Sequence, residues 1–208
     1  MILVLAAPSG AGKTTLAHAL VEHRTDVEFS LSATTRPPRP GEQHDEDYHF
    51  VDDAGFDRLL ADGELLEWAM VHGRRYGTMR AGVEAALAAG RHVVLDIDVQ
   101  GAQRVRRSLP DAGLVFILPP SAAEMLRRLR TRGSEGPEEL KTRMRTALAE
   151  LDAVSGFDHV IINAEFGEAL AEIESILDGS APTQDDAEIA AVLERLRADI
   201  NDIIQGGI

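Results

Sequence analysis

The residues with the clearest chemistry lie near the start of the chain, in a glycine-rich turn that ends in Gly-Lys-Thr. The segment Ala7-Pro-Ser-Gly-Ala-Gly-Lys-Thr14 follows the apolar run Ile2–Ala6 and precedes a helix-like stretch. It matches the Walker pattern, except that Ala7 replaces the first glycine. Backbone N–H groups of such a turn can surround phosphates at the positive end of a helix. A turn without a ligand is the plain alternative, but the placement between strand and helix predicts a nucleotide site.

Individual roles follow from phosphate and magnesium chemistry. Lys13 is expected to reach the β- and γ-phosphates of ATP, and Thr14 to offer its hydroxyl to Mg²⁺. Asp96 is the second predicted metal ligand, because Val93-Val-Leu-Asp96 is an apolar strand that ends in an acid. The predicted ATP-binding residues are Ala7, Pro8, Ser9, Gly10, Ala11, Gly12, Lys13, Thr14 and Thr15. Alanine is tolerable at position 7 if its φ is negative. Such a loop does not by itself distinguish kinases from GTPases and other ATPases.

A second unusual motif is Arg36-Pro-Pro-Arg39-Pro-Gly-Glu, which is followed by Tyr48. Proline fixes its own φ and restricts the preceding residue, so both arginines are held on a stiff, extended backbone. Two planar guanidinium groups with a nearby phenol can clamp a phosphate monoester. A solvated proline-rich loop is the alternative.

These motifs need a scaffold, and the apolar pattern predicts a parallel sheet wrapped by helices. Apolar runs of strand length alternate with helix-like segments, which is typical of α/β domains. The predicted buried strands are Ile2–Ala6, Val93–Ile97, Val115–Leu118 and Val160–Ile162. The predicted helices are Leu16–His23, Thr78–Ala89, Val99–Arg107, Ala122–Arg132, Pro137–Leu151 and Glu165–Leu177. Asp98 is expected to share the strand face of Asp96 if pairing continues that far.

The pattern changes between Ser32 and Gly77 and again after Ser180. Short mixed strands and one helix near Phe56–Ala61 predict a small inserted α+β lobe. In the tail, Thr183 and Asp186 resemble a capping box. One helical face then carries Ile189, Val192, Leu193, Leu196, Ile200, Ile203 and Ile204. We expect this face to pack on the chain's own core, with a homo-oligomer contact through the C-terminal helix as the alternative.

Composition limits the partners of the chain. The net charge of −14 argues against nucleic acid, because phosphate backbones are bound by clustered cations. The absence of cysteine excludes disulfides and thiolate metal sites. Apolar runs are too short to span a bilayer and no basic segment precedes the first one, so a cytoplasmic protein without a membrane partner is expected.

Two features of the composition have plain explanations. Only Lys13 and Lys141 are lysines among 21 basic residues, which either a saline cytoplasm or a nucleotide bias toward arginine codons would produce. The histidines show no convincing metal spacing. We interpret the group His44, Asp45, Asp47 and His49 as a polar surface loop rather than a metal site.

Taken together, the motifs resemble those of guanylate kinases, a family of P-loop nucleoside monophosphate kinases. The resemblance is carried by Ser32-Ala-Thr-Thr-Arg-Pro-Pro-Arg-Pro-Gly-Glu42, Asp47-Tyr-His-Phe50, Leu66-Glu-Trp68, Tyr76-Gly-Thr78, Leu95-Asp-Ile-Asp-Val-Gln-Gly101 and Asn163. It runs from about Ile2 to Leu177 and does not cover the tail. It implies an enzyme of purine metabolism that transfers a phosphoryl group from ATP to GMP with Mg²⁺.

The resemblance also implies a division of the chain. A guanylate kinase-like domain would span residues 1–179 and a helical tail residues 180–208. The domain would comprise a nucleotide-binding core (1–31, 79–120 and 158–179), a GMP-binding lobe (32–78) and a helical lid (121–157).

Acceptor roles come from the same resemblance. The GMP phosphate or its surroundings would be held by Ser32, Arg36, Arg39, Tyr48 and Tyr76. Glu67, Thr78 and Asp98 match the positions that face guanine. A carboxylate suits this base, because it accepts hydrogen bonds from N1–H and the 2-amino group. An ordinary strand carboxylate is the alternative reading of Glu67.

The transferring phosphates would meet cations from the core and the lid. The resemblance gives catalytic roles to Lys13, Arg36, Arg128, Arg132 and Arg143. Phosphoryl transfer depends mainly on positioning and charge neutralisation, which arginines provide. A solvated basic helix face is the alternative. No general base is expected, since the attacking phosphate oxygen is already anionic.

Two other functions remain to be weighed. A related kinase could act on a sugar phosphate such as a ribose bisphosphate, but it would not need Glu67, Thr78 and Asp98. A guanylate kinase-like scaffold domain could bind phosphopeptides without catalysis, but it would not need the Gly-Lys-Thr cradle and Asp96.

Overall fold

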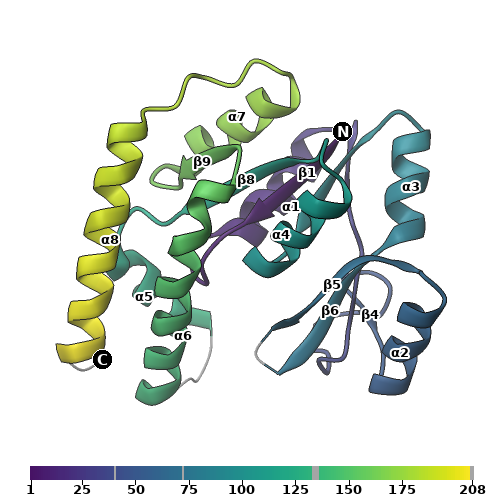
Figure 1. The fold of residues 1–208 in the computed structure, drawn as a ribbon, viewed down its shortest axis with the longest axis horizontal. Coiled ribbons are helices and arrows are strands. Elements are labelled where there is room, and N and C mark those ends of the chain that lie inside the picture. The colour runs from purple at the N-terminus through teal and green to yellow at the C-terminus, as the bar shows by residue number, and fades with distance from the viewer. Residues whose placement is uncertain (40, 72, 133–135, 207–208) are drawn as a thin grey trace. The chain divides into compact units, whose positions relative to one another are not determined.

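The computed structural model describes residues 1–39, 41–71, 73–132 and 136–206 (Figure 1). Within these ranges, five strands form one sheet in the order β2-β7-β1-β8-β9. They are β1 (Ile2–Ala6), β2 (Val27–Phe29), β7 (His92–Asp96), β8 (Gly113–Leu118) and β9 (His159–Ile162). The β2–β7 and β8–β9 pairs are parallel. The predicted fold class, a parallel sheet flanked by helices, is confirmed.

The main strands lie where the apolar runs predicted them. Strand β1 has the predicted bounds, and every residue of it is buried. A strand covered on both faces reads as a continuous apolar run, which explains why the sequence revealed it. Strand β2 was not predicted, because Val27–Phe29 is only three residues long and contains a glutamate.

The described chain divides into two compact units. The first comprises residues 1–4 and 21–113 and contains a smaller sheet in the order β4-β3-β6-β5. Its strands are β3 (Ser32–Thr34), β4 (His49–Phe50), β5 (Leu65–Val71) and β6 (Arg74–Met79). Its helices are α2 (Asp53–Ala61), α3 (Arg80–Ala88) and α4 (Val99–Ser108). A small core of Ala33, Phe56 and Leu65, flanked by Trp68, supports this sheet.

Two predictions in this unit are wrong. Thr78 was assigned to a helix, but it lies in β6 opposite Ser32 and Glu67, and α3 begins at Arg80. Asp98 was expected on the strand face of Asp96 if pairing continued that far, but the condition is not met, because the strand ends at Asp96. The Asp98 side chain instead accepts a hydrogen bond from the Gly101 N–H, so it caps the N-terminus of α4.

The second unit comprises residues 5–20 and 114–208. Its helical elements are α1 (Lys13–His23, which continues past residue 20), α5 (Ala122–Arg132), α6 (Pro137–Glu150), the 3₁₀ turn η1 (Leu151–Gly156), α7 (Phe166–Leu177) and α8 (Asp186–Gly206). The C-terminal helix α8 contacts α5 and α6, beside which it runs in Figure 1. Leu196 and Ile200 of its apolar face are fully buried within the chain, as expected of a face that packs on its own core.

The N-terminus of α8 differs from the prediction. Thr183 was expected to cap the helix, but the Asp185 carboxylate accepts from the N–H groups of Ala187 and Glu188. Just before it, the side-chain amide of Gln184 forms two hydrogen bonds with the backbone of Val160 in β9. Its oxygen accepts from the Val160 N–H, and its nitrogen donates to the Val160 carbonyl. Over the described part of the chain, no helix is both long enough and apolar enough to cross a bilayer.

Candidate donor and acceptor sites

The glycine-rich turn between β1 and α1 has the backbone of a phosphate-binding loop. Gly10 and Gly12 both have positive φ, at 91° and 96°. Among the described residues only Asp45 combines a side chain with positive φ, so the condition set for alanine at position 7 is met. Helix α1 begins at Lys13. The first-turn N–H groups and the lysine therefore stand where the Walker pattern predicts them.

Two of the three predicted lid arginines contact this loop. Arg128 on α5 donates to the carbonyl oxygen of Ala11 at 3.1 Å and is oriented by Glu124 at 2.6 Å. Arg143 on α6 donates to the hydroxyl oxygen of Ser9. The side chain of the third, Arg132, lies outside the described part of the structure, and its role stays a prediction.

Asn163, which directly follows β9, holds the phosphate-binding loop through a side-chain hydrogen bond. Its side chain is 4% exposed, and its Nδ2 donates to the Ala11 carbonyl at 2.7 Å. A Cβ added at Gly12 would lie 2.5 Å from the same Nδ2. Asn163 therefore requires glycine at position 12 and restrains the preceding residue of the loop, Ala11.

A pocket of about 550 Å³ opens beside the loop within the second unit. It is lined by Gly10, Gly12, Thr15, Arg127, Arg128, Thr131, Asn163, Ala164, Glu165 and Phe166. The sequence analysis did not single out the segment 164–166. Its position directly after a buried strand was the available signal, because ligands of parallel sheets bind at the carboxyl ends of strands.

The predicted phosphate clamp lies in the first unit, where Arg36 is already oriented. Its guanidinium forms a bidentate pair with Glu42, both bonds being 2.8 Å, and lies 5.2 Å from the centroid of the Tyr48 ring. Glu42 also accepts from the Arg39 N–H at 2.7 Å. The hydrogen-bonded ion pair with Arg36 lowers the pKa of Glu42. The side chain of Arg39 is exposed and open to a ligand.

Two phenols stand beside this arginine. The rings of Tyr48 and Tyr76 meet edge to face, with centroids 6.1 Å apart. Burial, together with the charge of Asp96 and the neighbouring Tyr76, raises the pKa of Tyr48 to about 12. Tyr48 therefore keeps its hydroxyl proton and can donate it to an anion.

Glu67 forms the centre of the predicted base site. It is 7% exposed, and its Oε1 accepts the hydroxyl proton of the fully buried Thr78 at 2.8 Å. Burial and the charge of Asp98 raise its pKa, although the bond from Thr78 acts in the opposite direction. Ser32, also buried, is paired with Thr78 across β3 and β6. The structure thus brings the predicted guanine-facing residues of this unit together.

The same motifs occur in known proteins. The guanylate kinase family profile matches residues 1–180. This chain belongs to the guanylate kinase family. A family member from Dechloromonas aromatica (strain RCB) is 47% identical over 197 residues, which are 94% of this chain and 98% of that protein. A guanylate kinase from Gluconobacter oxydans (strain 621H) is 52% identical over 176 residues, covering 84% of this chain and 85% of the other.

A solved structure of the family supports the fold. The crystal structure of guanylate kinase from Anaplasma phagocytophilum is 34% identical, with a TM-score of 0.72, and covers 88% of this chain and 87% of that one. The match to the Dechloromonas relative also reaches into the tail, because 94% coverage is more than residues 1–180 supply.

The metal ligands predicted for this family member are chemically suitable. Thr14 and Asp96 offer hydroxyl and carboxylate oxygens, which Mg²⁺ prefers. Thr14 lies in the first turn of α1 and Asp96 at the carboxyl end of β7, and both are partly exposed. Their joint use in binding Mg²⁺ stays a prediction.

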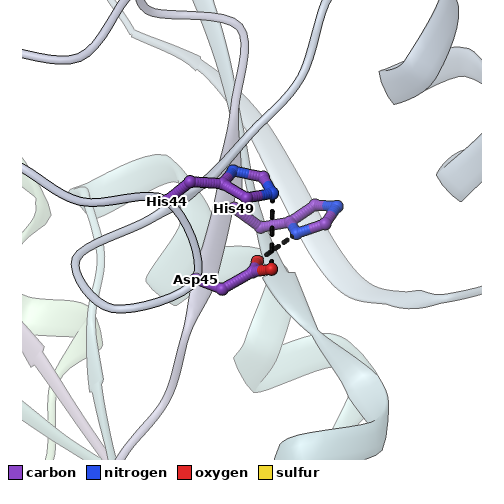
Figure 2. A group of neighbouring side chains, drawn as sticks. All are labelled: His44, Asp45 and His49. Carbon is purple, nitrogen blue, oxygen red and sulfur yellow. Dashed lines mark hydrogen bonds and ion pairs between the residues drawn. The ribbon is translucent and has the colours of Figure 1, made fainter.

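Figure 2 shows the cluster of His44, Asp45 and His49, whose ligand atoms lie within 4.8 Å of one another. The Phe50 N–H donates to Nδ1 of His44, so the neutral ring carries its proton on Nε2. That nitrogen lies 3.3 Å from Asp45, and His49 bonds the other oxygen of the same carboxylate. Because a metal ligand needs a free nitrogen lone pair, this geometry favours the polar loop that the sequence indicated.

Proposed function

We propose that this chain is an ATP:GMP phosphotransferase, which converts GMP and ATP to GDP and ADP. The observation that carries the proposal is the buried Glu67, held by Thr78 in a unit that also contains the Arg36 clamp. Family membership supports the same activity. The cytoplasmic location stays a prediction from the sequence.

The base site is suited to guanine. An ionised Glu67 can accept hydrogen bonds from N1–H and the 2-amino group of guanine, while a hydroxyl such as that of Thr78 can serve O6. Adenine presents an acceptor at N1 and would leave the carboxylate without a donor. Because an unpaired buried polar group is costly, such a site rejects the wrong base strongly.

The donor site is suited to a nucleoside triphosphate. The loop N–H groups and Lys13 would hold the phosphates, and the adjacent pocket would receive the nucleoside. Arg128 and Arg143, which already contact the loop, would offset charge on the transferring phosphoryl group. Thr14 and Asp96 would hold Mg²⁺, which would neutralise part of the phosphate charge.

Residues of the acceptor clamp would hold the attacking phosphate. Arg36 and Arg39 would bind the GMP phosphate, with the Tyr48 hydroxyl as a hydrogen-bond donor beside them. In this structure Glu42 occupies the Arg36 fork, so the incoming phosphate would have to replace or share that partner. The attacking oxygen needs no base, because the phosphate is ionised at neutral pH.

A coupled ADP-release assay tests the proposal. The purified chain would be given ATP and Mg²⁺ with GMP, AMP, UMP, CMP or ribose 1,5-bisphosphate in turn. We expect turnover with GMP alone among these acceptors. Turnover with the sugar phosphate instead would overturn the guanine assignment, and a lack of turnover with every acceptor would favour a binding domain without catalysis.

A further inference from the structure

Arg104 lies on α4 against β5, next to the proposed guanine site, and the sequence analysis gave it no role. Its guanidinium carbon is 5.3 Å from the centroid of the Trp68 ring. Its Nη1 is buried and has no hydrogen-bond partner among the described residues. A buried guanidinium N–H without a partner is uncommon in folded proteins and calls for an explanation.

The ring of Trp68 explains how this cation is held. Arginine stacks well on an indole face, which fixes the plane of the guanidinium without consuming its N–H groups. Trp68 itself packs edge to face on the buried Phe56, with centroids 6.2 Å apart. Arg104 is therefore anchored by contacts other than a carboxylate pair.

Glu67 lies against the same side of α4, because Gly101, beside which its carboxylate lies, stands three residues before Arg104 in that helix. Its Oε1 is bound by Thr78, and its Oε2 lies 3.0 Å from where a Cβ at Gly101 of α4 would stand. Three groups on the surrounding elements act on its charge, namely Thr78 on β6, Asp98 at the N-cap of α4, and Arg104 within α4. Burial and Asp98 raise the pKa of Glu67, whereas Thr78 and Arg104 lower it.

We propose that Arg104 is a positioning residue for guanine recognition, because its cation offsets the repulsion that Asp98 exerts on the buried Glu67 carboxylate. The inference rests on the proposed function of this site. It assigns Trp68 the task of holding the cation, and Gly101 the task of leaving room for the carboxylate. The Glu67 carboxylate can then stay ionised toward the N1–H and 2-amino donors of the base.

The test compares Arg104→Gln with Arg107→Gln, which removes an exposed arginine from the same helix. Because the variant removes a cation that favours the ionised form of Glu67, we expect Arg104→Gln to raise the KM for GMP severalfold. The kcat and the KM for ATP should change less than about twofold, as should every parameter of Arg107→Gln. Arg104→Lys, which keeps the charge, should recover part of the GMP affinity.

The pH profile separates this role from a structural one. Without the cation, Glu67 stays protonated to higher pH, so the GMP defect of Arg104→Gln should be largest in acid and shrink as pH rises. Ionisation of the GMP phosphate, with a pKa near 6, affects wild type and variant alike and cancels in the ratio. A defect of equal size at every pH, or an unchanged KM for GMP, would overturn the proposal.

Binding measurements keep the test independent of catalysis. Trp68 is the single tryptophan of the chain, so its fluorescence reports on this site directly. GMP titrated into wild type should change the emission, and Arg104→Gln should need severalfold more GMP to give the same change. Binding of GMP without turnover in wild type would refute the proposed kinase activity while leaving the role of Arg104 testable. Equal affinities of wild type and variant would refute that role.

Discussion

Glu67 illustrates how one buried side chain can be both unfavourable for folding and useful for recognition. Its pKa is raised mainly by burial, so the ionised form is destabilised before any ligand arrives. A ligand that donates two hydrogen bonds to the carboxylate relieves that destabilisation. Guanine meets this requirement, and the penalty for leaving the carboxylate unmatched is the basis of selectivity.

Glu67→Gln should therefore weaken GMP use by about 2 to 3 kcal/mol in kcat/KM, as expected for a lost charge-assisted bond. The KM for ATP should stay nearly constant. Steady-state kinetics with each substrate varied would measure both effects. Glu64→Gln, at an exposed position nearby, is the matched control, and an unchanged GMP profile in Glu67→Gln would show that the base site is misplaced.

The pH dependence of wild type follows from the same residue. Because the pKa of Glu67 is raised, its protonated form persists to higher pH than that of an ordinary glutamic acid. A protonated carboxyl group that points its hydrogen at the guanine N1–H cannot accept a hydrogen bond from it. Affinity for GMP should therefore fall on acidification while affinity for ATP is retained. Calorimetric titration across the acid range would check this, and parallel losses for both nucleotides would contradict it.

Asn163 offers a second residue-level prediction, at the donor site. Asn163→Ala would leave the buried Ala11 carbonyl without one of its donors, at about 1 to 3 kcal/mol. We expect a higher KM for ATP with little change in the KM for GMP. Asn201→Ala, which removes an exposed asparagine of α8, should change neither value.

Residue types indicated which chemistry to look for, but not which side chains would be partners. The sequence singled out Arg36 by the chemistry of its motif and Glu67 by the family resemblance, and the roles of both stay predictions. It did not predict that Glu42 binds Arg36 or that Arg104 stacks on Trp68, since those contacts depend on how separate segments pack. Asn163 was noticed as part of a motif, but its bond to the loop is a long-range contact that sequence spacing does not reveal.

At the level of elements, two glycines with positive φ differ in their surroundings: Gly12 of the phosphate loop and Gly90 between α3 and β7. Gly12 needs both a positive φ and the absence of a side chain, because a Cβ would meet Asn163 and Arg128. Gly90 also has a positive φ but has open space around it. A side chain at Gly90 would meet backbone strain alone, whereas a side chain at Gly12 would meet both backbone strain and a steric clash.

Gly12→Ala and Gly90→Ala should both lower the free energy of unfolding by about 1 to 2 kcal/mol, the usual penalty of a left-handed residue with a side chain. Only Gly12→Ala should also abolish ATP binding, because the loop would have to move away from Asn163. Denaturant unfolding and nucleotide titration measure the two effects. Retained ATP affinity in Gly12→Ala would contradict the steric argument.

The elements that the sequence located well are those with long apolar patterns. Helix α5 has the predicted bounds, and α6 and α7 differ by one residue at one end. The errors lie where local signals compete. Thr78 sits at a junction of strand and helix, and its pairing with Ser32 in β3 decides its conformation. Asp98 lies outside the strand, because aspartate is a favourable N-cap residue and here caps the N-terminus of α4.

For the whole molecule, the dominant property is the net charge of −14. Such an excess destabilises the compact state through self-repulsion, which salt screens. The melting temperature should therefore rise when KCl is added from low to molar concentration. Differential scanning calorimetry would measure the shift, with a neutral osmolyte at equal osmolality as the control. A falling melting temperature would mean that surface ion pairs outweigh the repulsion.

The side chain of Gln184 gives the tail a further significance. Its amide accepts from the Val160 N–H at 3.1 Å and donates to the Val160 carbonyl at 2.7 Å, as a neighbouring strand would do. Strand β9 is the last in its sheet, and an unpaired sheet edge is a template for strand addition between molecules. A chain shortened after residue 180 would keep every residue matched by the family profile but lose this cover. We therefore expect the shortened chain to associate with itself through β9 more readily than the full chain.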